Sequence, residues 1–194
     1  MKKGLLIILS GPSGVGKGAV KRILMEDSSL DLTYSISMTT RAPRHMEKDG
    51  VDYFFVDQET FQKNVDEGNL LEHVSFVGNS YGTPRDYVEK LRNEGKNVLL
   101  EIEVQGARQV LAKMHGDDII SIFLIPPSLG ILEKRIRKRR TEPEEIIQAR
   151  LKKARGELAC KYNYKYIVLN DIVGRAAEEI KGIIRNSVAN HQKS

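Results

Sequence analysis

Several residue types are scarce in this chain of 194 residues, which contains no tryptophan, one cysteine and six prolines. The single cysteine, Cys160, excludes an intrachain disulfide and suits a reducing compartment, so we expect a cytoplasmic protein. Cys160 has no cysteine or histidine nearby at metal-ligand spacing, and we predict no metal site built from protein side chains alone. No apolar run approaches the roughly 20 residues of a membrane-spanning helix, so we expect no membrane partner.

The charge balance is basic, with a formal net charge of +5 and a pI of about 9.2. Such a balance suits an anionic partner, which can be a nucleotide, a nucleic acid or a membrane surface. Charge alone does not distinguish among the three. The length suits one domain with a hydrophobic core and a small inserted lobe.

Short apolar runs alternate with segments of helical periodicity along most of the chain. The runs at 5–9, 98–102, 119–125 and 166–169 are typical of strands buried on both faces. Helical spacing appears at 105–114, 128–140 and 172–188. This alternation predicts an α/β fold, in which a parallel sheet is flanked by helices on both faces.

The segment 38–93 has a different pattern and predicts a small mixed α+β lobe inserted into the larger domain, which comprises 1–37 and 94–194. Residues 51–56 favour a strand, residues 58–67 a helix that Gly68 ends, and residues 70–77 a second strand. The sequence Gly-Asn-Ser-Tyr-Gly at 78–82 predicts a turn-rich loop.

A glycine-rich motif lies directly after the first strand and before a helical segment. It reads Gly11, Pro12, Ser13, Gly14, Val15, Gly16 and Lys17, the G-x-x-x-x-G-K pattern of a phosphate-binding loop. Glycines let backbone N–H groups converge on phosphate oxygens, and the helix N-terminus adds its positive end. Lys17 supplies a mobile charge for the outer phosphates. We predict that residues 11–18 bind nucleotide phosphates and that Lys17 is also catalytic.

The motif departs from its usual form immediately after the lysine. A serine or threonine normally holds Mg²⁺ there, but this chain has Gly18 and Ala19. Because the charge of a triphosphate still has to be neutralised, we expect Mg²⁺ as a cofactor, held mainly by phosphates and water. Glu101 or Glu103 would assist at the end of the strand 98–102, although both also fit as ordinary strand-end residues.

A second motif begins at Thr40. Arg41, Arg44 and Tyr53 can hold a phosphate through forked charge-assisted bonds and a phenol O–H, although a basic surface loop has the same composition. The run resembles the guanylate kinase signature at every fixed position: Thr40-Arg41-x-x-Arg44-x-x-Glu47-x-x-Gly50-x-x-Tyr53-x-Phe55-Val56. Together with the phosphate-binding loop, the resemblance covers nearly the whole chain.

The resemblance implies a kinase that moves the γ-phosphoryl group of ATP to GMP by direct in-line transfer, with ATP on the sheet domain. It implies that the GMP phosphate is bound by Arg41, Arg44, Tyr53 and Tyr81, and that Arg41 is also catalytic. It implies that Ser37, Glu72 and Thr83 read the guanine base, with Glu103 nearby. A carboxylate suits guanine because N1–H and the 2-amino group are adjacent donors. Without the resemblance, Glu72 is interpreted more simply as a solvated strand residue.

Six of the seven residues 134–140 are basic. Such a run usually forms a solvated helix face or a nucleic-acid-binding patch. By the resemblance, Arg135, Arg139 and Arg150 belong to a mobile lid over ATP, at about 134–150, and stabilise transition-state charge. Family members usually carry Arg-Gly-Thr-Glu where this chain has Arg-Arg-Thr-Glu at 139–142, so the hinge glycine is absent. The resemblance also places Asn170 near adenine.

Three other functions are consistent with parts of the sequence. Guanylate-kinase-like domains also serve as protein-interaction modules, but the intact Gly11, Gly16 and Lys17 argue against this. The basic run at 134–140 would serve a nucleic-acid binder, and the phosphate-binding loop alone would serve another small-molecule kinase. We predict ATP and GMP as partners, without nucleic acid. The oligomeric state does not follow from the sequence.

Overall fold

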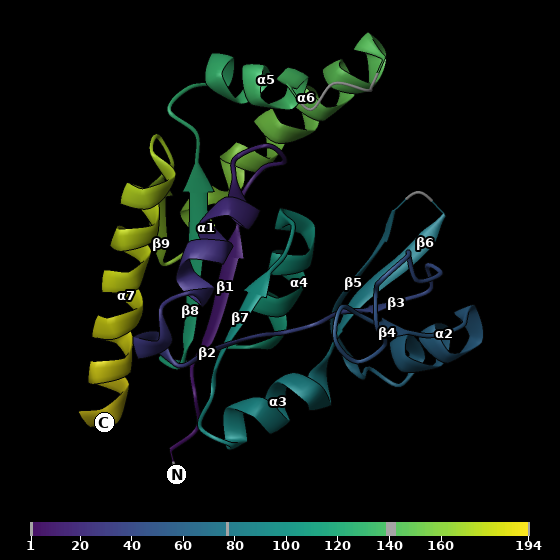
Figure 1. Cartoon of the computed structure of the whole chain (residues 1–194), viewed down its shortest axis with the longest axis vertical. Helices are drawn as coiled ribbons and strands as arrows, with labels where there is room; N and C mark the ends of the chain where they lie inside the picture. The colour runs from purple at the N-terminus through teal and green to yellow at the C-terminus, as the bar shows by residue number, and fades with distance from the viewer. Residues whose placement is uncertain (1, 77, 139–142, 194) are drawn as a thin grey trace.

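Five parallel strands form the larger sheet of the computed structural model, which describes residues 2–76, 78–138 and 143–193. The strand order is β2-β7-β1-β8-β9, and every neighbouring pair is parallel (Figure 1). The elements of this part are β1 (Leu6–Ser10), α1 (Lys17–Met25), the 3₁₀ helix η1 (Ser28–Leu30), β2 (Leu32–Tyr34), α3 (Arg85–Asn93), β7 (Asn97–Glu101), α4 (Val104–Lys113), β8 (Ile119–Ile125), α5 (Leu129–Lys138), α6 (Glu144–Leu158), the 3₁₀ helix η2 (Ala159–Asn163), β9 (Tyr166–Leu169) and α7 (Val173–Lys193). The predicted parallel sheet with flanking helices is confirmed.

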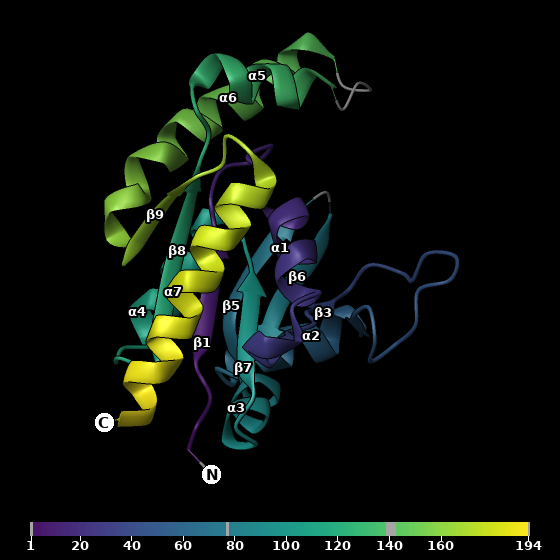
Figure 2. The same ribbon diagram turned by 60° about the vertical axis from the view of Figure 1, so that its left-hand side comes forward.

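The central strand β1 is buried on both faces, and its side chains divide the core into two layers. Ile7 and Leu9 join the cluster that includes α1 and α7, while Leu6 and Ile8 join the cluster that includes α3 and α4. Successive strand residues point to opposite faces, so a continuous apolar run is required here. Each fully buried leucine or isoleucine stabilises the fold by roughly 1.5–3 kcal/mol. Figure 2 shows α7 lying along one face of the sheet.

A smaller mixed sheet forms the inserted lobe, in the order β4-β3-β6-β5. Its elements are β3 (Met38–Thr39), β4 (Phe54–Phe55), α2 (Gln58–Asp66), β5 (Leu70–Phe76) and β6 (Asn79–Pro84). β3 pairs parallel with β4 and antiparallel with β6, which also pairs antiparallel with β5. Helix α2 begins at the cap Asp57, whose carboxylate accepts the Thr60 N–H, and Gly68 follows its end with φ +69°. The predicted helix, its glycine stop and the mixed lobe are confirmed.

Two predictions within the lobe are wrong. The strand predicted at 51–56 is only Phe54–Phe55, because its partner β3 is two residues long and Val51 lies in an exposed turn after Gly50. The loop predicted at 78–82 is mostly strand β6, which pairs on both sides. Pairing and packing outweigh the poor strand propensity of glycine here. At Gly82, a Cβ would lie 2.8 Å from Leu70 Cδ1, so the glycine itself is part of the packing.

Helices α5 and α6 lie together at the end of the sheet where the parallel strands finish, as Figure 1 shows. They flank residues 139–142, so the predicted lid at about 134–150 is described only in its two helical parts. In the described residues, no helix is both long and apolar enough to span a membrane.

Candidate functional site

The glycine-rich motif forms the loop between β1, which ends at Ser10, and α1, which begins at Lys17. Gly14 and Gly16 have φ of +83° and +104°, values that L-amino acids rarely adopt. A Cβ on Gly14 would lie 2.8 Å from Ile136 Cγ1, and one on Gly16 would lie 2.5 Å from Asn170 Nδ2. Both backbone conformation and space therefore require glycine, and the strand–loop–helix context predicted from the sequence is present.

Two residues from elements distant in sequence are hydrogen-bonded around the backbone of this loop. Asn170, which follows β9 and is fully buried, donates its Nδ2–H to the Val15 carbonyl at 2.8 Å. Arg135 on α5 donates to the Val15 carbonyl at 3.1 Å and to the Asn170 carbonyl at 2.9 Å. The structure thus brings Asn170 and Arg135 to the loop backbone. The predicted contact of Asn170 with adenine stays a prediction.

Two cationic side chains, from Lys17 and Arg150, contact the loop. Lys17 Nζ donates to the carbonyls of Gly11 at 2.6 Å and Pro12 at 3.3 Å. Arg150 on α6 donates to Ser13 Oγ at 2.7 Å, which links α6 to the loop. A cavity of about 280 Å³ lies against the loop and is lined by Ser13, Gly14, Gly16, Lys17, Gly18, Glu101, Ile102 and Glu103. The ammonium group of Lys17 and the N–H groups at the start of α1 suit a polyphosphate in this cavity.

A buried carboxylate lies in the acceptor part of the site. Glu72 on β5 is 4% exposed, and its Oε1 accepts the Thr83 hydroxyl at 2.7 Å. A Cβ on Gly106 of α4 would lie 2.7 Å from Glu72 Oε2, so the glycine leaves room for the carboxylate. Burial raises the pKa of the Glu72 carboxyl, although the bond from Thr83 and the charge of Lys113 oppose this. A buried carboxylate of this kind requires hydrogen-bond donors. The interpretation of Glu72 as a solvated strand residue is wrong.

Arg41 is held in a cluster of aromatic rings and one carboxylate. Its guanidinium carbon lies 5.3 Å from the Tyr53 ring centroid, and the Tyr53 and Tyr81 centroids are 6.2 Å apart. Both Glu47 oxygens accept from Arg41 Nη2 at 2.9 Å, and one also accepts the Arg44 N–H at 2.7 Å. The Arg44 N–H and the Arg41 guanidinium lower the pKa of the Glu47 carboxyl. Glu47 thus holds the Arg41 guanidinium through one of its terminal nitrogens and also holds the backbone of Arg44.

A second cavity, of about 320 Å³, opens between the lobe and the large sheet. It is lined by Ser37, Tyr53, Glu72, Val74, Ser75, Phe76, Tyr81, Glu101, Ile102, Glu103, Gln105, Gly106 and Lys153. Five of the predicted acceptor residues line it, namely Ser37, Tyr53, Glu72, Tyr81 and Glu103. Glu101, Ile102 and Glu103 line both cavities, so the two meet at the end of β7.

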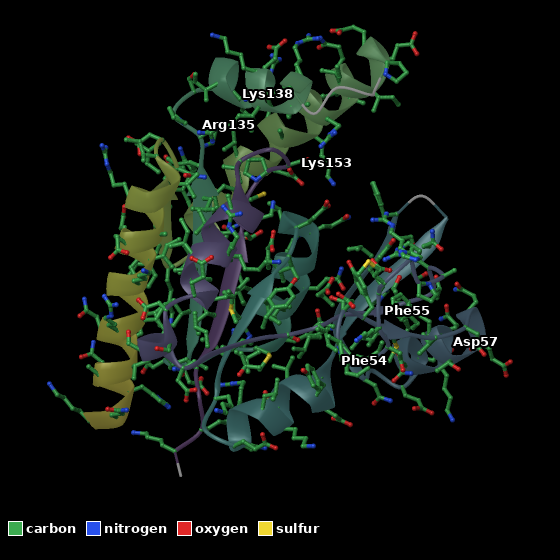
Figure 3. All side chains as sticks on the ribbon, viewed as in Figure 1. Phe54, Phe55, Asp57, Arg135, Lys138 and Lys153 are labelled. Atoms are coloured by element: carbon green, nitrogen blue, oxygen red, sulfur yellow. The ribbon has the colours of Figure 1, made fainter. Side chains whose placement is uncertain are left out.

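The carboxylates at this meeting point are each paired with a lysine. Glu101 Oε2 lies 2.8 Å from Lys21 Nζ of α1, and Glu103 Oε2 lies 2.8 Å from Lys153 Nζ of α6. Figure 3 shows Lys153 and Arg135 at the end of the sheet near α5 and α6, with Phe54 and Phe55 in the lobe. Within residues 2–76, 78–138 and 143–193, no group of three or more His, Cys, Asp or Glu side chains is placed to hold a metal ion.

The basic run at 134–140 does not form a uniform cationic face in its described part. Arg135 turns inward to the loop, Ile136 is 2% exposed, and Arg137 pairs with Glu133 and Glu144. Lys134 and Lys138 are exposed. This distribution argues against a nucleic-acid patch, because such a patch needs its cations on one accessible surface. The predicted catalytic Arg139 lies outside the described residues.

Sequence reasoning gave no role to three residues that the structure brings into the site. Glu47 was only a signature position, yet it holds Arg41. Lys21 and Lys153 contact the two strand-end carboxylates from α1 and α6. The position of Lys21, one helical turn after Lys17 and on the same face of α1, was the available signal. The position of Lys153 gave no such signal, because the pairing crosses from α6 to β7.

Comparison with known proteins gives a consistent result. The Guanylate kinase family model matches residues 3–187. A guanylate kinase of Mesoplasma florum is 54% identical over 182 residues, which are 94% of this chain and 61% of that protein. This chain therefore spans less than two thirds of that relative. A guanylate kinase of Malacoplasma penetrans is 50% identical, with 96% of this chain and 95% of that protein covered. The crystal structure of guanylate kinase from Anaplasma phagocytophilum has a TM-score of 0.72 at 34% identity, covering 96% of this chain and 87% of that one.

Proposed function

Because this chain belongs to the guanylate kinase family, we propose that it transfers the γ-phosphoryl group of ATP to GMP, giving ADP and GDP. The observation that carries the proposal is the meeting of two cavities at the end of β7, where they share Glu101, Ile102 and Glu103. One cavity is lined by the phosphate-binding loop and the other by a buried carboxylate with tyrosines. Phosphoryl transfer requires donor and acceptor phosphates in one such continuous space.

The two substrates divide the chain in this proposal. ATP binds the part made by residues 1–37 and 94–194, with a lid at about 134–150, and GMP binds the lobe of residues 38–93. Helix α3 ends the lobe segment, but its Val88 packs with Leu6 and Ile8 of the large sheet. We therefore expect the lobe to move relative to α3, with α3 staying on the sheet.

Transfer in this site needs positioning and charge neutralisation, without a protein nucleophile. An oxygen of the GMP phosphate forms the bond to the γ-phosphorus as the bond to the bridging oxygen of ADP breaks. Lys17 and the loop N–H groups hold the ATP phosphates, and Arg41, Arg44, Tyr53 and Tyr81 hold the phosphate of GMP. Arg135 and Arg150 stabilise the charge that develops on the moving group. Closure of the lid would exclude water, which otherwise competes as acceptor.

Mg²⁺ fits the donor set at the end of β7. Gly18 carries no side chain, and an ideal Cβ there would lie 3.7 Å from Glu101 Oε1, so a carboxylate oxygen faces the position of the usual hydroxyl. Oxygen ligands, few of them from protein, suit Mg²⁺ bound with a triphosphate. Glu101, and Glu103 beside it, would hold the ion or its water. Bound there, Mg²⁺ would neutralise the charge of the β- and γ-phosphates.

The test of this function is ADP release from ATP in the presence of GMP, dGMP, AMP, CMP or UMP. We expect GMP to give the highest kcat/KM, with AMP and the pyrimidine nucleotides lower by orders of magnitude. Equal rates for AMP and GMP would contradict the assignment of the acceptor. No acceptor-dependent ADP release with any nucleotide would contradict the kinase assignment itself.

Replacing Arg150 by methionine is expected to lower kcat roughly tenfold to a hundredfold, while KM for GMP changes little. Arg150 reaches the loop at Ser13 and lies outside the acceptor cavity, so its charge serves the transferring group. A hydrogen bond from a charged group contributes about 1.5–3 kcal/mol, which sets this range. Steady-state kinetics with both substrates varied provide the measurement. Arg155→Met, on the exposed surface of the same helix, is the matched control. A rise in KM for GMP with kcat unchanged would assign Arg150 to the acceptor site.

A further inference from the structure

The residue after Lys17 lacks a hydroxyl, and one carboxylate lies beside the resulting space. Gly18 is helical, and the nearest atom to its ideal Cβ is Glu101 Oε1 at 3.7 Å. Glu101 is the last residue of β7, the strand next to β1, and its side chain is 18% exposed. It also lines the cavity of the phosphate-binding loop. The oxygen that faces Gly18 therefore points toward the place where the usual hydroxyl would hold Mg²⁺.

The other oxygen of the same carboxylate is held by Lys21. Lys21 Nζ lies 2.8 Å from Glu101 Oε2, and its side chain is 28% exposed. Lys21 and Gly18 are three residues apart, so both lie on the face of α1 that looks toward β7. One lysine thus holds one carboxylate oxygen and leaves the second oxygen directed at the glycine.

Lys21 is itself fixed at a second point. Its Nζ lies 4.3 Å from the ring centroid of Tyr34, which is on β2. The ammonium group of Lys21 is thus held between a carboxylate and an aromatic face. The comparable pair Lys153–Glu103 is about half exposed on both sides and is held less firmly.

We propose that Lys21 is a positioning residue that aims Glu101 at the space left by Gly18, so that the carboxylate replaces the missing hydroxyl in binding nucleotide-associated Mg²⁺. This inference rests on the proposed binding of ATP with Mg²⁺. Groups that orient a metal ligand through a hydrogen bond typically change metal affinity by about 10- to 100-fold when removed. Lys21 acts through Glu101 and needs no contact with the nucleotide.

The first test measures binding and does not require turnover. ADP affinity of the whole chain is determined by calorimetry without divalent metal and at increasing free Mg²⁺. In Lys21→Met we expect the Mg²⁺ concentration that gives half of the maximal increase in ADP affinity to rise about tenfold or more. The ADP affinity without metal should be unchanged. Arg22→Met, the exposed neighbour on α1, should match the parent protein. An unchanged Mg²⁺ dependence in Lys21→Met would overturn the proposal. Equal weakening with and without metal would also overturn it, because Lys21 would then act on the phosphates.

A double-mutant cycle separates positioning from a general effect on the fold. Glu101→Gln should produce the same rise in the Mg²⁺ requirement, and adding Lys21→Met to it should have no further effect. Additive effects would show that Lys21 acts independently of Glu101. A melting curve for each protein separates a loss of Mg²⁺ binding from a loss of fold, and Glu101→Gln tests the carboxylate without changing Lys21.

A rescue variant tests the role of the glycine directly. Gly18→Ser fits because the nearest atom lies at ordinary contact distance. In Lys21→Met/Gly18→Ser we expect the Mg²⁺ requirement to return to that of the parent protein, and failure to do so would contradict replacement of a hydroxyl. If the acceptor panel fails while these ADP measurements hold, the kinase assignment is wrong and the role of Lys21 stands. The converse result would reject the role of Lys21 alone.

Discussion

Replacing Lys17 by methionine is expected to lower kcat for GMP phosphorylation by about 10²–10³-fold, the usual effect of removing one charge that stabilises a transition state. The substitution keeps most of the side-chain volume and removes only the ammonium group. In the structure that group is bonded to the carbonyls of Gly11 and Pro12, at the mouth of the loop cavity. It therefore lies where the outer phosphates of ATP are expected.

The measurement is single-turnover ADP formation, with a thermal melt on the same sample. Lys17 lies at the first position of α1 and is only partly buried, so we expect the melting temperature to change little. Lys90→Met, an exposed lysine on α3, is the control for loss of one positive charge. Retention of most of the activity in a folded Lys17→Met protein would contradict the role of the loop in catalysis.

Replacing Glu72 by glutamine is expected to lower kcat/KM for GMP roughly tenfold to a hundredfold and to narrow the preference over AMP. In the proposed complex the carboxylate would accept hydrogen bonds from guanine N1–H and the 2-amino group, whereas glutamine would offer a donor in place of one acceptor. Hydrogen bonds to a charged group contribute about 1.5–3 kcal/mol, which gives this range. Adenine has an acceptor at N1 and no 2-amino group, so the AMP rate should fall less or even rise.

The kinetic measurement is kcat/KM for GMP and AMP in both proteins, and an unchanged ratio would show that Glu72 does not read the base. A melting series supplies an independent readout. Because the pKa of Glu72 is raised in the folded state, protonation favours folding, and stability is lost as the pH rises through the folded pKa. Glutamine carries no charge and escapes this loss. The melting temperature of unliganded Glu72→Gln, relative to that of the parent protein, should therefore increase as the pH rises from about 4 to 8. A constant difference across that range would contradict the burial of a charged carboxylate.

The large sheet could be predicted because its strands are short apolar runs that must be buried on both faces. The side chains of residues 6–9 alternate between two core layers, and none of them is exposed to solvent. The phosphate-binding loop could be predicted because its glycines encode backbone conformations directly. In both cases, the structural requirement acts on consecutive residues and can be recognised in a short stretch of sequence.

Features that depend on pairing between distant segments were not predicted. Strand β6 contains Gly82 and reads as a loop, yet its two neighbours in the sheet determine its conformation. Strands β2 and β3 are three and two residues long, too short for any periodicity. The contacts Lys21–Glu101 and Asn170–Val15 join residues far apart in sequence, and a single sequence does not show which residue each of them pairs with.

The acceptor motif was located through its resemblance to a family, and its residues alone did not identify it. Considered by residue type alone, Arg41, Arg44 and Tyr53 fit a basic surface loop as well as they fit a phosphate-binding site. The structure shows how they are brought together, because Glu47 holds the Arg41 guanidinium and the Tyr53 ring lies 5.3 Å from it. Glu72 likewise became a credible base-reading residue only when its burial was known.

The strand order has a consequence for the order in which substrates bind. The lobe is inserted between β2 and β7, on one side of the central strand β1, whereas α5 and α6 connect β8 to β9 on the other side. The lobe and the helices α5 and α6 are thus attached to the sheet on opposite sides of β1. If GMP binds the lobe and ATP the phosphate-binding loop, as proposed, we expect each covering element to move without the other. The topology therefore permits a random-order kinetic scheme, in which either binary complex proceeds to the ternary one.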